Sequence, residues 1–170
     1  MDMFIKKSFW AAALSLAMIG GGIAAVNAES APSPLQSTMQ AYVISQGQDG
    51  KEVAQLAEEV EPGQIVEYRL DYKNVGKSAL KGIAVTGPVP DATHYLGDTA
   101  KTRADTDFQV SIDGGKTFEG EPVKRMVENG QGKKVEKIIP PSEYTHVRWI
   151  LKQPLNAGEA ESFSYRSLVD

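Results

Sequence analysis

The alternation of apolar and charged residues is clearest over residues 65–73, which read Ile65-Val66-Glu67-Tyr68-Arg69-Leu70-Asp71-Tyr72-Lys73. In an extended chain the apolar residues from Val66 to Tyr72 share one face, and the charged residues share the other. A period of two is typical of an antiparallel strand with one face in the core and one in solvent. This segment therefore predicts a half-buried β-strand.

The same pattern recurs along the chain and predicts further short strands. They are expected at about 39–44, 51–53, 80–86, 93–96, 108–112, 117–118, 144–151 and 163–169. Residues 126–137 are polar and glycine-rich, which predicts an exposed loop. About seven to nine strands separated by turns, with no long helix, favour an all-β antiparallel β-sandwich.

Residues 1–28 have the composition of a secretory signal peptide. Lys6-Lys7 precedes an apolar run over 9–26, and Val26-Asn27-Ala28 offers small residues for cleavage after Ala28. An uncleaved anchor is the alternative, but Gly20-Gly21-Gly22 makes the run a poor permanent helix. We expect export to the periplasm or the medium, with no stable membrane anchor after cleavage.

The rest of the 170-residue chain is expected to be a short linker (29–34) and one domain (35–170). The chain has 18 Lys+Arg and 22 Asp+Glu, a net charge of −4, and loss of the signal peptide would make it one unit more negative. An acidic surface gains little from a polyanion, so nucleic acid is not an expected partner. The absence of cysteine excludes disulfides and thiolate chemistry.

Two segments resemble a bacterial conserved repeat, the domain of unknown function eleven. The first covers residues 60–76, with Pro62-Gly63, a strand centred on Tyr68, and then Asn74 and Gly76, and it continues over 80–90. The second covers Val147–Leu151 with Trp149, then Leu155 and Ala157-Gly158-Glu159. Together the matches cover most of residues 60–170.

This resemblance implies an immunoglobulin-like sandwich of exported and cell-envelope proteins, with no assigned catalytic residues. The chain departs from the family by holding one copy and by an insert at about 99–140. From the residues alone, Tyr68 and Trp149 are expected to be inward-facing anchors. Gly76 and Gly158 are expected at turn positions with positive φ.

A hairpin motif lies within the insert at Ser111-Ile112-Asp113-Gly114-Gly115-Lys116-Thr117-Phe118. It matches the Asp-box pattern of sialidases through Ser111, Asp113, Gly115, Thr117 and Phe118. Asp113 is expected to accept hydrogen bonds from its own turn, with Phe118 packed beneath it. In sialidases the box braces a hairpin away from the active site, and an enzyme of that class would need several boxes. We therefore predict no enzymatic activity.

Other candidate chemistry is weak. His94 and His146 lack the convergent ligands that a zinc site needs, so we predict no metal and no cofactor. The acidic residues Asp98, Asp105, Asp107 and Asp113 leave a calcium site open as an alternative, although no EF-hand loop is present. A calcium- or glycan-binding module using these acids and exposed aromatics such as Tyr95 and Tyr144 is the second hypothesis.

The leading hypothesis is a non-enzymatic envelope protein, a structural or protein-interaction module that contacts an envelope protein or glycan. Exposed loops on a rigid sandwich are where binding residues usually lie, which favours residues 124–137 and the Asp113 hairpin. Residues 124–137 are rich in lysine, whereas residues 52–61 are rich in glutamate. These two patches could meet head to tail between copies, contact the anionic cell surface, or be solvated faces.

Overall fold

The computed structural model describes residues 33–170. The predicted signal peptide and most of the predicted linker lie outside these residues. The described part is all-β, with one short 3-10 turn at Pro141–Glu143 and no α-helix. Within it, no helix is long and apolar enough to cross a membrane.

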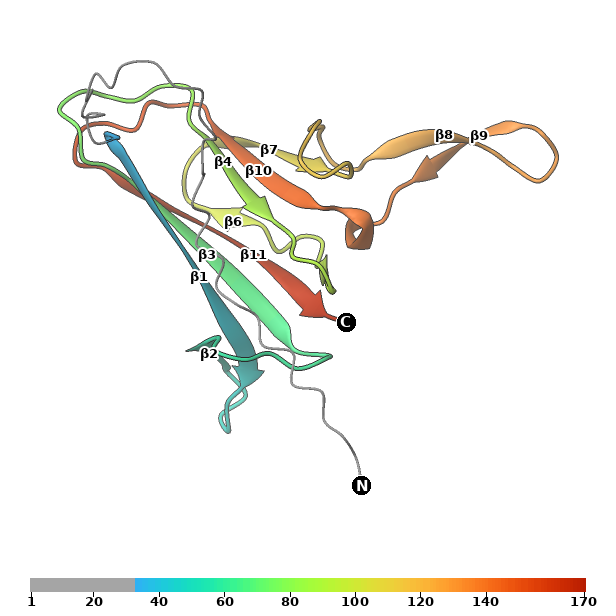
Figure 1. Cartoon of the computed structure of the whole chain (residues 1–170), viewed down its shortest axis with the longest axis horizontal. Helices are drawn as coiled ribbons and strands as arrows, with labels where there is room; N and C mark the ends of the chain where they lie inside the picture. The colour runs from blue at the N-terminus through green and yellow to red at the C-terminus, as the bar shows by residue number, and fades with distance from the viewer. Residues whose placement is uncertain (1–32) are drawn as a thin grey trace, which may run out of the picture.

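The strands form two antiparallel sheets and a separate hairpin (Figure 1). The larger sheet contains β1 (Leu35–Gln46), β2 (Glu52–Leu56), β3 (Ile65–Asn74), β5 (Thr93–Tyr95), β6 (Lys101–Thr102) and β11 (Ala160–Val169). The smaller sheet contains β4 (Ala84–Pro88), β7 (Thr106–Ser111) and β10 (His146–Leu151). The hairpin contains β8 (Lys124–Glu128) and β9 (Lys134–Ile138).

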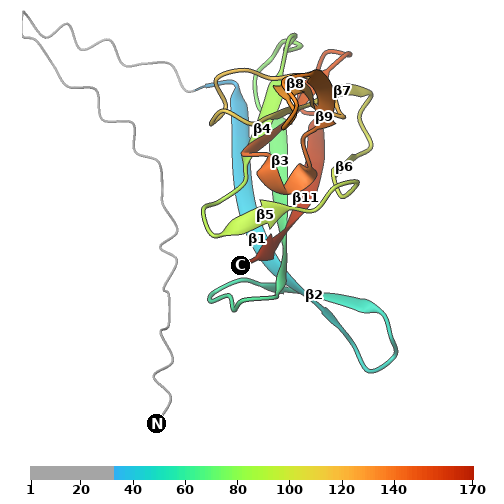
Figure 2. The same ribbon diagram turned by 90° about the vertical axis from the view of Figure 1, so that its right-hand side faces the viewer.

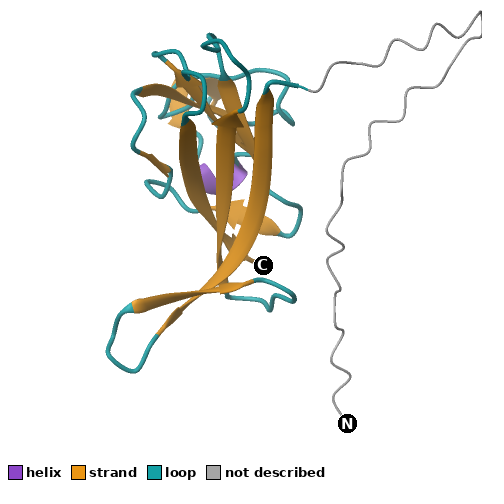
Figure 3. Cartoon of the chain, turned by 90° about the vertical axis from the view of Figure 1, so that its left-hand side faces the viewer, coloured by secondary structure: helices purple, strands orange, loops and turns teal. Residues whose placement is uncertain are grey.

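The strand order is β2-β1-β3-β11-β5 in the larger sheet, with β6 also paired to β11, and β4-β10-β7 in the smaller sheet. The three long strands of the larger sheet run side by side in Figure 3. Alternation predicted the inward residues of β3, β10 and β11 correctly. In β10, for example, Val147, Trp149 and Leu151 are buried, while the residues between them are partly exposed.

Aromatic side chains join the two sheets into a sandwich. Trp149 of β10 is 2% exposed, and its ring centroid lies 5.4 Å from that of Phe163 and 6.2 Å from that of Tyr165, both on β11. Tyr165 in turn stacks on Tyr68 of β3 with ring centroids 5.0 Å apart. These contacts confirm the predicted all-β sandwich and the inward positions of Tyr68 and Trp149.

The two sheets differ in width, because the smaller sheet has half as many strands as the larger. The shared core therefore lies against β3, β11 and β5. All of β2 is exposed, and β1 adds only Leu35 and Ala41 to the edge of the core. Figure 2 shows the β1–β2 hairpin extending beyond the body of the sandwich.

The largest difference from the sequence predictions lies at residues 126–137. The predicted loop is instead the β8–β9 hairpin, turned through Asn129, whose side-chain oxygen accepts hydrogen bonds from the backbone of Gln131 and Lys133. The strand predicted over 51–53 is also longer than expected, since β2 runs to Leu56.

One predicted strand begins later than expected, and another is absent. The strand predicted over 80–86 begins only at Ala84, because Leu80 makes a single bridge to Leu155 and the ladder with β10 starts four residues later. Residues 117–118 form no strand, since the chain re-joins β7 only through the bridge between Val110 and Glu119.

The aromatic core provides the first prediction. Phe163→Ala removes a ring that packs between Trp149 and the larger sheet, so we expect a loss of unfolding free energy of about 3–5 kcal/mol. Phe118→Ala, at a partly exposed phenylalanine, should cost less. Trp149 is the one tryptophan outside residues 1–28, so its fluorescence during urea unfolding measures both values. Equal losses for the two variants would contradict the assignment of Phe163 to the core.

Candidate functional site

The residues of the conserved-repeat resemblance are spread over the domain and form no single site. Gly63, next to Pro62, has a φ of 83° and lies in the turn just before β3, where its N–H donates to the Val169 carbonyl at 2.8 Å. Tyr68 and Trp149 lie in the core. Asn74, Gly76 and Gly158 are found together where β3 ends. Each of these positions serves the fold.

Asn74 organises the turn after β3. Its side chain is fully buried, and its amide nitrogen donates at 2.8 Å to the carbonyls of both Ser78 and Leu155. Its side-chain oxygen accepts from the Gly76 N–H at 2.9 Å. Its backbone carbonyl accepts from Gly158, which has the expected positive φ of 82°. A buried polar side chain is stable here because every polar atom has a partner.

The prediction that Gly76 has a positive φ is wrong. It is absent from the positive-φ residues of the described chain, so left-handed backbone does not explain it. A Cβ at this position would instead lie 2.8 Å from Cβ of Pro34 and 3.2 Å from the Asn74 side-chain oxygen. Glycine is required because the start of β1 packs directly against this turn.

The Asp-box turn has the hydrogen bonding that the motif predicts. Oδ1 of Asp113 accepts from the Thr117 N–H at 2.9 Å and the Lys116 N–H at 3.1 Å, and Oδ2 accepts from the Thr117 hydroxyl at 2.6 Å. Ser111 donates to Asp113 at 2.7 Å and accepts from the Gly115 N–H. These bonds, led by that of the Thr117 hydroxyl, hold the pKa of Asp113 well below its ordinary value.

Phe118 packs on the outer face of β10 rather than beneath the Asp113 carboxylate. The Arg148 guanidinium lies 3.3 Å from the centre of its ring, and the His146 ring meets it edge to face at 6.4 Å. Burial, together with the charge of Arg148, lowers the pKa of His146. The cation–π contact joins the box to the smaller sheet.

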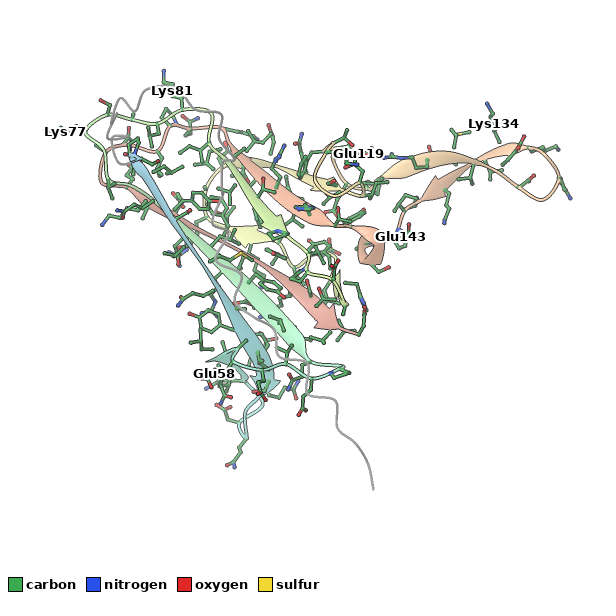
Figure 4. The ribbon with its side chains drawn as sticks, in the orientation of Figure 1. Glu58, Lys77, Lys81, Glu119, Lys134 and Glu143 are labelled. Atoms are coloured by element: carbon green, nitrogen blue, oxygen red, sulfur yellow. The ribbon has the colours of Figure 1, made fainter. Side chains whose placement is uncertain are left out.

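The Asp-box turn also fixes the base of the β8–β9 hairpin. Immediately after the box, Glu119 exchanges two backbone hydrogen bonds with Val110 of β7. The Glu119 carboxylate accepts from both terminal nitrogens of Arg125 on β8, which lowers the pKa of Glu119. Figure 4 shows Glu119 where the hairpin leaves the sandwich. The box therefore orients the hairpin.

We call residues 124–138 the arm. At its base Val123 and Ile139 are buried, whereas every residue of β9 is exposed. Met126 is 64% exposed and Ile138 58%. The register places Met126 opposite Glu136 and Lys124 opposite Ile138, so Met126 and Ile138 share one face. Figure 1 shows the arm projecting away from both sheets.

An ion network on the outer face of the larger sheet was missed by sequence reasoning. Glu67 was predicted to face solvent, but it is 8% exposed because Arg166 and Arg69 cover it, donating at 2.8 and 2.7 Å. Arg166 also donates two hydrogen bonds to Glu52 of β2. Burial of the Glu67 carboxylate raises its pKa, but the hydrogen bonds and positive charges of Arg166 and Arg69 lower it by more. The net effect is a pKa below the ordinary value. The network ties β2 to β11.

The acidic residues of the calcium or glycan hypothesis do not come together in one site. Asp105 and Asp107 both pair with Lys152, at 3.1 and 3.2 Å. Asp98 lies in the turn after β5, and Asp113 is bonded within its own turn. Residues 33–170 contain no group of three or more His, Asp or Glu side chains placed to hold a metal.

The predicted exposure of Tyr95 and Tyr144 is wrong. Tyr95 is 2% and Tyr144 3% exposed, because the two rings stack on each other with centroids 6.0 Å apart inside the core. The two histidines are also separated, since His94 Nδ1 lies 2.6 Å from the Asp170 carboxylate and His146 lies on the smaller sheet.

The Asp-box turn predicts a pH-dependent contribution to stability. Because the pKa of Asp113 is lower in the folded than in the unfolded chain, its carboxylate stabilises the fold above the ordinary Asp pKa of about 3.9. That contribution disappears as the pH falls toward the folded-state pKa. We expect Asp113→Asn to melt below the wild type at pH 7, with the two midpoints converging below about pH 4. Asp91→Asn, at an exposed position, serves as the control, and a constant gap for Asp113→Asn across this range would contradict the assignment.

Comparison with known proteins finds no relative of this chain. No family model, curated protein or solved structure matches the chain. The resemblance to the bacterial conserved repeat therefore remains an expectation from the residues quoted for it.

Proposed function

We propose that this chain is a non-enzymatic exported protein of the cell envelope, and that it binds a macromolecular partner through the arm. Export is supported by the signal-peptide pattern of residues 1–28, and the envelope location by the conserved-repeat resemblance. The observation that carries the proposal is the exposure of Met126 and Ile138 on a hairpin with a fixed base.

The exposure of the arm has an energetic cost without a partner. A two-stranded hairpin alone in water is only marginally stable. Here the ion pair between Arg125 and Glu119 and the anchoring of Val123 and Ile139 hold its base. Burial of the exposed apolar side chains against a partner would contribute about 25 cal/mol for each Å² removed from water. The arm is thus held ready to bind, since its orientation is set before the partner arrives.

The charges of the arm are consistent with a selective contact. Lys124 pairs with Glu136 across the two strands at 3.0 Å, whereas Lys133, Lys134 and Lys137 have no carboxylate within 4.0 Å among residues 33–170. Lysine on exposed strand edges disfavours indiscriminate pairing with other sheets. A partner of the arm should therefore combine an apolar patch with acidic groups.

Photocrosslinking tests this proposal. A photoreactive phenylalanine analogue at Met126, in the full chain expressed with its own leader, should give discrete crosslinked species in intact cells. The same analogue at Lys81, an exposed position in the turn before β4, is the matched control and should give none. Crosslinking at Met126 that is absent, or no more discrete than at Lys81, would contradict the role of the arm.

A further inference from the structure

The exposed apolar side chains of the described chain gather in two places. Large apolar residues that are at least 40% exposed are Met39, Val53, Leu56, Val75, Met126, Val135 and Ile138. Three of them lie in the arm, and Val53 and Leu56 lie in the β1–β2 hairpin. Met39 lies on β1 just before that hairpin, where β1 pairs with β3. We call residues 39–61, which contain Met39, this hairpin and the loop after β2, the overhang.

The overhang exists because the smaller sheet does not cover the whole of the larger one. Met39 pairs with Leu70, whose side chain is buried in the core, and Val53 pairs with Ser45, six residues further along β1. Met39 and Val53 therefore lie on the face of the larger sheet that continues the core surface. This face lacks a covering layer within residues 33–170. A second apolar hairpin could supply that layer.

The overhang and the arm carry opposite charge. In the overhang Lys51 pairs with Asp49 and Glu52 pairs with Arg166. Glu58, Glu59 and Glu61 are exposed and have no cation within 4.0 Å among the described residues. The arm holds the three lysines described above, also without partners. The overhang and the arm thus each have three exposed apolar side chains. The three unpaired charges of the overhang are negative, whereas three of the four in the arm are positive, the fourth being Glu128.

From this complementarity we infer that the partner of the arm is a second copy of this chain. The arm of one copy docks on the overhang of the next, with Met126 and Ile138 against the uncovered face near Met39 and Val53. The two surfaces lie at separate ends of the molecule (Figure 4, Lys134 and Glu58). A single copy therefore cannot satisfy both. The inference rests on the proposed function, to which it adds the identity of the partner.

Head-to-tail contact has a defined consequence for assembly. Each dimer keeps one free arm and one free overhang, so further copies can add and form a filament or a closed ring. The weight-average mass should therefore continue to rise with protein concentration beyond that of a dimer. It should fall when salt is raised, because exposed charges are screened within about 8 Å at 0.15 M ionic strength.

Charge reversal tests the contact by sedimentation equilibrium of the protein purified after export. Lys134→Glu with Lys137→Glu, or Glu58→Lys with Glu59→Lys, should each raise the dissociation constant about tenfold or more. An equimolar mixture of the two variants should associate again, because each carries the complement of the other. Lys77→Glu with Lys81→Glu makes the same change in net charge away from both hairpins and should associate like the wild type.

Several results would overturn the inference: a monomeric wild type at all concentrations, association unaffected by either reversal, or a mixture that stays monomeric. The mass of the species crosslinked at Met126 shows whether the partner is a second copy or a different protein. It therefore distinguishes a failure of self-association from a failure of the proposed function. A crosslink to a different protein, with a monomeric wild type, refutes self-association and leaves the role of the arm intact. The absence of any specific crosslink refutes both.

Discussion

The packing of Trp149 against Phe163 and Tyr165 is the contact on which the structure depends. It is where a three-stranded sheet meets a six-stranded one, and it forms the centre of a continuous aromatic cluster that reaches Tyr68 on one side and Phe108 on the other. The chain has no cysteine to cross-link the sheets. Burial of these rings, together with the aliphatic side chains of the core, therefore holds the two layers together.

The unequal width of the sheets explains where the chain is exposed. A narrow second sheet covers β3, β11 and β5 and leaves β2 and much of β1 uncovered. At another end, the segment between β7 and β10 forms a hairpin whose apolar residues also lack a cover. Hydrogen bonds and ion pairs hold both hairpins to the sandwich. The Arg166 network holds β2, and Arg125 with the Asp-box turn holds the arm. These are polar contacts near the surface, so each hairpin should open more easily than the core.

Residue alternation predicted the elements that are half buried and failed for those that are not. β3, β10 and β11 have one face in the core, and this asymmetry is what a period of two records. Neither face of the arm is buried, and the buried residues Val123 and Ile139 lie just outside it. Its polar, glycine-rich sequence therefore resembles that of a loop. The turn at Asn129 and the Val127–Val135 pair were the available signals for a hairpin.

Other errors arose where tertiary contacts decide the environment. Glu67 is buried because Arg166, far away in sequence, lies opposite it in the register. Tyr95 and Tyr144 are buried because they stack on each other, and Gly76 is glycine because Pro34 approaches it. Of the candidate site, the Asp-box turn and the lysine-rich segment were predictable from sequence. The exposure of Met126 and Ile138, and the match between arm and overhang, could not be predicted from sequence. Both depend on how the sheets are arranged in space.

Hydrogen exchange at two protein concentrations, read by mass spectrometry, tests the central claim most directly. At low concentration, we expect slow exchange in β3, β10 and β11 and fast exchange in both hairpins. At high concentration, protection should appear in the arm and in the overhang together, because each covers the other in a neighbouring copy. Protection that appears in one hairpin alone, or hairpins as protected as the core when the protein is dilute, would contradict the account.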